Sequence, residues 1–162
     1  KSQILEERRK IVNILLLDLD QWNRKQIATI PLGNRFLVFK HKAMEYYADK
    51  YGFNTISLLN YLGHSGSLRP ETLSTVMRKL KEYDVKVLFS EQKPPSKLIK
   101  SISQKSSISI ASKPIYVDGI RPGGSILTTA ISNTCIIVNS LSGSCNKQTG
   151  QILKARWEAL VR

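Results

Sequence analysis

Four side chains that can bind a metal ion follow four short apolar segments of the chain. His41 follows residues 35–39, His64 follows 55–60, Glu91 follows 86–90 and Asp118 follows 114–117. If these segments are parallel strands, their carboxyl ends lie at one edge of a sheet, where open α/β proteins bind ligands. Imidazole and carboxylate are ligands of zinc, manganese and iron, so His41 and Asp118 together would supply half of a four-coordinate site.

Each of these residues also has an interpretation without a metal. His41 lies between two lysines and can be a surface or capping residue, and His64 lies in an exposed Gly/Ser loop. Glu91 can accept backbone N–H bonds at the helix start near Pro94, and Asp118-Gly119 is a common turn. Only convergence of these side chains in the fold separates the two interpretations.

Other catalytic arrangements are absent from the sequence. It contains no G-x-S-x-G elbow, no P-loop and no G-x-G-x-x-G motif. The sequence therefore favours a protein that is not an enzyme, although a small enzyme that uses the same sheet edge is one alternative. Cys135 and Cys145, ten residues apart, are compatible with a disulfide or with two thiols, and the count alone does not decide between them.

The elements that must position these residues alternate along the chain. Residues 1–25 have apolar positions at steps of three and four, which predicts one long helix. Short Val-, Ile- and Phe-rich segments then alternate with helical segments around 41–51, 70–81, 94–102, 125–141 and 152–160. This order predicts an α/β fold: a four-stranded parallel sheet with helices on both faces, preceded by a long linking helix.

The charge raises a separate question about partners. The chain has 25 Lys and Arg against 12 Asp and Glu, a formal net charge of +13, which makes nucleic acid or an anionic surface a candidate partner. The basic residues are interleaved with acidic ones, however, and the sequence has no RNP-like aromatic strand, zinc-finger spacing or dense basic tract. We therefore expect no nucleic-acid partner, and a basic α/β nucleic-acid-binding domain is the alternative function.

Several segments resemble cluster A-I metal-binding proteins of ABC transporters. The run VFKHKAMEYYA at 38–48, followed by Tyr51-Gly52, is similar to the family's strand that leads into a histidine and an aromatic pair. Arg69-Pro70-Glu71 resembles its Pro-initiated helix, VLFSE at 87–91 its strand ending in Glu, and PIYVDG at 114–119 its last strand. The resemblance covers residues 1–142. Lys42 departs from it, because the family commonly has Asp after the histidine.

The resemblance implies a function and a division of the chain. Residues 1–30 would be the long interlobe helix and residues 31–162 a C-terminal α/β metal-binding lobe. In this family a divalent zinc, manganese or iron ion binds between two lobes and is delivered to a membrane permease. His41 and Asp118 match the ligands of the C-terminal lobe, and the missing N-terminal lobe would supply the others. We therefore expect an extracytoplasmic or periplasmic, membrane-associated protein. The sequence starts at Lys1 without a signal peptide, so we expect it to be a piece of a longer chain.

Overall fold

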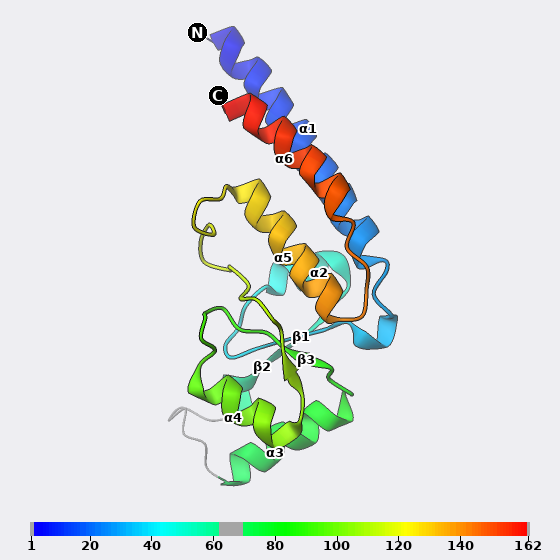
Figure 1. The fold of residues 1–162 in the computed structure, drawn as a ribbon, viewed down its shortest axis with the longest axis vertical. Coiled ribbons are helices and arrows are strands. Elements are labelled where there is room, and N and C mark those ends of the chain that lie inside the picture. Colours follow the sequence, from blue (N-terminus) through cyan, green and yellow to red (C-terminus); the bar gives the residue numbers. More distant parts are fainter. Residues whose placement is uncertain (1, 62–69, 162) are drawn as a thin grey trace.

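A parallel sheet of short strands lies between two layers of helices in the computed structural model, which describes residues 2–61 and 70–161 (Figure 1). β1 (Phe36–Phe39) pairs with β2 (Asn54–Ser57), and β3 (Val87–Leu88) pairs with β4 (Ser109–Ile110), both in parallel. The Phe89 N–H donates to the Val38 carbonyl at 2.8 Å and joins the two pairs in the order β2-β1-β3-β4. The predicted α/β class is confirmed, but the strand count is not exact: two two-stranded sheets lie side by side where we expected one four-stranded sheet.

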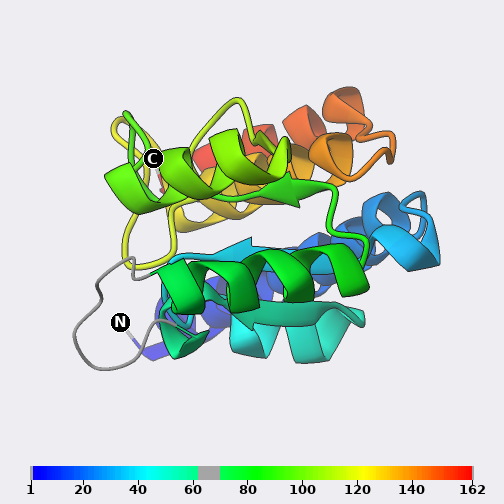
Figure 2. The ribbon, with the colours of Figure 1, turned by 90° about the horizontal axis from the view of Figure 1, so that it is seen from below.

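Helices cover both faces of this sheet. α2 (Glu45–Tyr51) and α5 (Ile126–Ser140) lie on one face, and α3 (Pro70–Glu82) and α4 (Lys97–Ser106) lie on the other (Figures 1 and 2). In β1, Leu37 and Phe39 belong to the buried cluster on the α5 face, whereas Val38 belongs to the cluster on the α3 and α4 face. A strand that is buried on both faces has no polar side, which explains why β1 is continuously apolar.

α1 (Ser2–Ile27) and α6 (Lys147–Val161) form an antiparallel pair that extends beyond the sheet, so that both chain ends lie at the same end of the molecule (Figure 1). α1 confirms the long helix predicted for residues 1–25, and its 26 residues span about 39 Å. Its buried residues begin only at Leu15; from there Leu19 and Trp22 pack with α5 and α6. No helix among the described residues is both long and apolar enough to cross a membrane.

Several element boundaries differ from the predicted ones for local reasons. The helix predicted from His41 begins at Glu45, because Met44 adopts a left-handed backbone conformation (φ 61°) that a helix interior does not admit. The last helix begins earlier than predicted, at Lys147, where the Asn146 side chain accepts a hydrogen bond from the Thr149 N–H. The second strand ends at Ser57, and residues 58–61 continue as a short 3₁₀ turn. Residues 114–117 form no strand, although Ile115 donates to the Ser90 carbonyl.

Candidate metal centre

His41 and Glu91 lie together at the carboxyl edge of the two central strands. Each follows its strand by two or three residues, and the hydrogen bond between Phe89 and Val38 sets the strands side by side. His41 Nε2 is 2.9 Å from Glu91 Oε2, while its other ring nitrogen, Nδ1, lies 3.4 Å from the Lys42 carbonyl oxygen. The fold thus brings together a nitrogen and an oxygen at a separation comparable to that of two ligands on one metal ion.

The surroundings of Glu91 raise the pKa of its carboxyl. Partial burial raises the pKa of this carboxyl above its ordinary value, and the negative charge of Asp118 raises it further. His41 and Lys40 act in the opposite direction and hold the pKa down. A bound cation would add to the second group of effects, because a positive charge near two carboxylates favours their ionised forms.

A small cavity of about 50 Å³ adjoins His41 on the β2 side. Ser57, the last residue of β2, lines it, and the buried Ser57 Oγ has no hydrogen-bond partner among the described residues. The cavity has room for a water molecule, which would satisfy such an orphaned hydroxyl. Polar atoms from β1, β2 and β3 thus share this edge of the sheet, which is compatible with a hydrated cation.

Asp118 reaches the same edge on residues 111–125, the segment after β4 that leads to α5. The buried Asn133 of α5 holds this segment: its side chain accepts a hydrogen bond from the Tyr116 N–H at 3.1 Å and donates one to the Tyr116 carbonyl at 2.7 Å. Asp118 is exposed and close enough to Glu91 for its charge to act on that carboxyl. Neither His41 nor Glu91 forms an ion pair with it, and within residues 2–61 and 70–161 no three His, Cys, Asp or Glu side chains converge on one point.

The structure places the four candidate residues differently from one another. The structure brings His41 and Glu91 into contact and places Asp118 within electrostatic reach of them, whereas His64 lies outside the described residues. The assignment of His41 and Asp118 as metal ligands stays a prediction. Sequence reasoning missed Ser57 and Asn133. The end of a strand was a usable signal for Ser57, but no local pattern identifies Asn133, whose partner lies 17 residues away.

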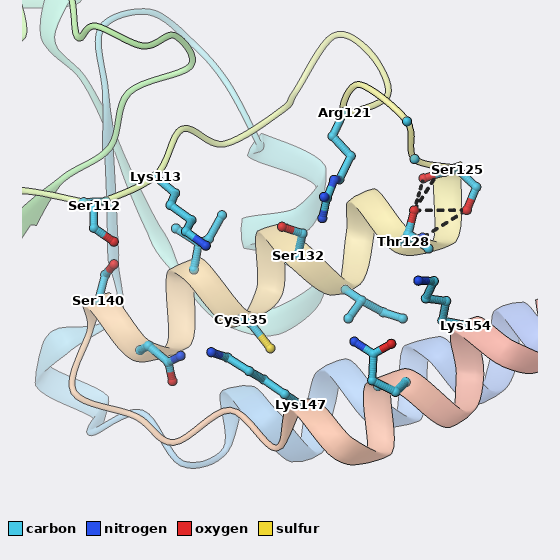
Figure 3. A pocket seen from close by; sticks show the side chains of 18 of the residues that line it. Ser112, Lys113, Arg121, Ser125, Thr128, Ser132, Cys135, Ser140, Lys147 and Lys154 are labelled. Carbon is cyan, nitrogen blue, oxygen red and sulfur yellow. Dashed lines mark hydrogen bonds between the residues drawn. The ribbon is translucent and has the colours of Figure 1, made fainter.

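A larger cavity, of about 930 Å³, lies between α5, α6 and the segment after β4 (Figure 3). Its lining includes none of His41, Glu91 and Asp118. Lysine and arginine side chains enter it instead, so its electrostatic character is opposite to that of the carboxylate-bearing edge. It is a separate feature of the molecule.

The fold is that of periplasmic metal-binding proteins. The structure of the periplasmic zinc-binding protein TroA from Treponema pallidum matches 87% of this chain and 53% of its own, with a TM-score of 0.72 and 19% identity. The structure of Fe(III)-bound YtgA from Chlamydia trachomatis matches 90% of this chain and 52% of its own, with a TM-score of 0.65 and 22% identity.

The sequence identifies the family. Residues 1–137 match the model of the periplasmic zinc-uptake complex component A, ZnuA, and the chain belongs to this family. The manganese-binding lipoprotein MntA of Halalkalibacterium halodurans is 29% identical over 116 residues, which are 72% of this chain and 38% of the relative. The metal-binding protein YtgA of Chlamydia pneumoniae is 28% identical over 140 residues, 77% of this chain and 42% of the relative. The chain thus spans about two fifths of these curated relatives, and the family comprises uptake components rather than enzymes.

Proposed function

We propose that this chain is the C-terminal metal-binding lobe of a solute-binding protein that delivers a divalent transition metal to an ABC transporter. The observation that carries the proposal is the contact between His41 Nε2 and Glu91 Oε2 at the carboxyl edge of adjacent strands, in a chain of the zinc-uptake family. His41 and Asp118 would be ligands of the transported ion. Glu91 would contact the same ion beside the His41 imidazole. The proposal includes no catalytic step, because the ion is cargo.

The donor set suits zinc, manganese or iron. All three ions accept imidazole nitrogen together with carboxylate oxygen. The residues present therefore fit any of these ions and do not select one of them. The relatives agree with this range, since they include manganese-binding, zinc-binding and Fe(III)-bound proteins. The specific metal would depend on ligands contributed from outside this chain.

A second lobe has a surface to pack against. α1 projects beyond the sheet, and its part up to Leu17 bears exposed apolar side chains, namely Ile4, Leu5, Ile11, Ile14, Leu16 and Leu17. Exposed apolar side chains gathered on one helix are typical of a surface that a partner covers. This supports the division into an interlobe helix at 1–30 and a metal-binding lobe at 31–162, with an N-terminal lobe as the partner.

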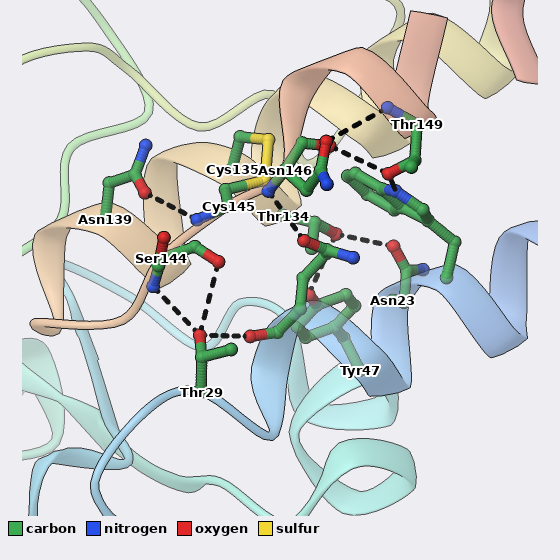
Figure 4. The surroundings of a disulfide bond; sticks show 12 residues. Asn23, Thr29, Tyr47, Thr134, Cys135, Asn139, Ser144, Cys145, Asn146 and Thr149 are labelled. Carbon is green, nitrogen blue, oxygen red and sulfur yellow. Dashed lines mark hydrogen bonds between the residues drawn. A yellow bond between two sulfur atoms is a disulfide. The ribbon is translucent and has the colours of Figure 1, made fainter. Parts of the chain in front are cut away.

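The disulfide supports a location outside the cytoplasm. Cys135 of α5 and Cys145 before α6 are bonded, with their Cα atoms 5.2 Å apart (Figure 4). Such bonds persist in oxidising compartments and are rare in the cytosol. The family description is periplasmic and one relative is named a lipoprotein, so we infer an extracytoplasmic protein held at the membrane that works with a permease.

Zinc binding by the purified chain tests the proposal. A chromogenic chelator in competition with the protein would report the affinity, which we expect to be weak because only part of a four-ligand set is present. His41→Ala and Asp118→Ala should each weaken binding at least about tenfold. Asp49→Ala is the matched control, since Asp49 is exposed on α2 and lies away from the edge.

Two results would contradict parts of the proposal. Equal affinities of the wild type, the two site variants and the control would remove His41 and Asp118 from the metal site. Tight binding by the chain alone would instead show that the other lobe is not needed. The comparisons lend no support to the nucleic-acid-binding alternative.

A further inference from the structure

The cavity between α5 and α6, called the groove below, has walls of mixed apolar and hydroxyl-bearing side chains and is lined by cations. Ile131, Ile136 and Trp157 contribute apolar surface, and hydroxyl groups of residues such as Ser132 and Ser140 lie among them. Its volume of about 930 Å³ is at the upper end of the range for small-molecule sites. This space is large enough for an organic molecule and much larger than a single inorganic ion requires.

Four cationic side chains line this groove from two sides. Lys113 and Arg121 descend from the segment after β4, and Lys147 and Lys154 reach toward α5 from α6 (Figure 3). Glu158 is the acidic residue of the lining; it pairs with Lys154 at 3.5 Å. The groove therefore has an excess of positive charge.

Carboxylates from other parts of the fold do not neutralise this positive charge. All 12 Asp and Glu residues of the chain lie within the described ranges, and none of them forms an ion pair with Lys113, Arg121 or Lys147 there. Positive charges of like sign repel one another when they share a cavity, and a bound anion relieves this repulsion. A divalent metal ion would have the opposite effect, which separates this groove from the proposed metal site.

The spacing of the cations limits the shape of the ligand. Lys147 and Lys154 are seven residues apart on α6, which places them on the same side of the helix at a separation of about 10 Å along its axis. Arg121, with its planar guanidinium, can bind a phosphate or carboxylate through two parallel hydrogen bonds. A ligand that reaches both ends of the groove needs anionic groups at both ends and an uncharged middle that can lie on Ile131, which is next to Gly150 between the two lysines.

We propose that this groove binds a small organic molecule that carries two or more phosphate or carboxylate groups. The proposal goes beyond metal transport and rests on the groove alone. Phosphate and carboxylate present the same fork of oxygen atoms to lysine and arginine, so the experiment must distinguish them. Two probes serve this purpose: adenosine triphosphate for the phosphates and citrate for the carboxylates, both with metal-free protein.

The test compares two variants that remove the same charge. Lys147→Gln/Lys154→Gln removes two cations from the groove, and Lys97→Gln/Lys100→Gln removes two exposed cations from α4, outside it. Isothermal titration calorimetry at physiological salt should show that the wild type binds at least one probe, and binds inorganic phosphate at least about tenfold more weakly. The groove variant should lose at least about tenfold in affinity, because each charged hydrogen-bond partner contributes roughly that factor, while the control loses less than about twofold.

A third variant guards against a folding defect. If thermal unfolding shows the double groove variant to be destabilised, Arg121→Gln provides the same comparison without any change in α6. Equal losses in the groove and control variants would mean diffuse attraction to a chain of charge +13 and would overturn the proposal, as would failure of the wild type to bind either probe. Binding of a single-stranded oligonucleotide in place of both probes, weakened equally by all variants, would also overturn it.

Discussion

His41 Nε2 lies 2.9 Å from Glu91 Oε2, although 50 residues separate them in the sequence. The contact follows from the parallel arrangement of β1 and β3, whose carboxyl ends meet at the same edge. Glu91 lies between two opposing influences, since His41 favours its ionised form and Asp118 opposes it. This balance makes the carboxyl of Glu91 a sensitive reporter of the whole edge.

Asp118→Asn should therefore lower the pKa of Glu91. The substitution removes a negative charge that favours the protonated form, whereas the effects of burial and of His41 stay in place. Carbon-detected NMR titration of the glutamate side-chain carboxyl would measure the change. Asp49→Asn, which removes a carboxylate from the exposed side of α2, should leave the Glu91 titration unchanged. If the pKa of Glu91 is unchanged in Asp118→Asn, Asp118 lies too far from Glu91 for the two carboxylates to bind the same metal ion.

Asn133→Ala should destabilise the chain by about 2–3 kcal/mol, because it removes two partly buried hydrogen bonds and leaves the Tyr116 N–H and carbonyl without this partner. The loss would also free the segment that carries Asp118. Chemical denaturation followed by circular dichroism would give the free energy of unfolding. Asn13→Ala, on the exposed side of α1, should stay within about 0.5 kcal/mol of the wild type. Similar small losses in both variants would show that Asn133 does not hold this segment.

Much of the sheet could be predicted because its two central strands, β1 and β3, are buried. Residues 36–39 are read as a strand from their continuous apolar character, and the parallel arrangement then implies that residues after the strands share an edge. His41 and Glu91 meet for this reason. The first helix was equally readable, since a three-and-four-residue apolar period over 25 positions has no other common origin.

The rest depends on contacts that leave no local trace in the sequence. The left-handed conformation of Met44 delays the start of α2, although nothing in the composition of 41–51 indicates it. Asn133 is one of several polar residues in α5, and its role follows only from the position of Tyr116 in space. The cationic groove combines residues from the segment after β4 with residues from α6, so its charge becomes visible only once these parts are packed together.

Acid should weaken the attachment of α1 to α2 through Asp20. Burial raises the pKa of this carboxyl, but hydrogen bonds from Lys50, Tyr51 and Arg24 outweigh burial and lower it to about 2. Because the folded-state pKa lies below the ordinary value of 3.8, this stabilisation is present above about pH 4 and is lost as the pH falls toward 2. Between pH 5 and pH 2 the free energy of unfolding of Asp20→Asn should fall by about 1–2 kcal/mol less than that of the wild type. Asp49→Asn should keep the acid sensitivity of the wild type, and an Asp20→Asn variant with the same acid sensitivity would contradict the assignment.

Reduction of the bond between Cys135 and Cys145 should lower the free energy of unfolding by about 2–3 kcal/mol, the value expected for a loop of about ten residues. The loop is also held by hydrogen bonds to the end of α1 and the turn after it, from the Asn146 N–H to Gln26 at 2.7 Å and from the Ser144 N–H to Thr29 at 2.9 Å. These contacts do not depend on the disulfide, so the reduced chain should stay folded and unfold at lower denaturant concentration. Denaturation with and without a reducing agent measures the difference. A Cys135→Ala/Cys145→Ala variant should match the reduced wild type and show no response to the reductant. A wild type whose stability is unaffected by reductant would contradict the presence of the bond in the folded protein.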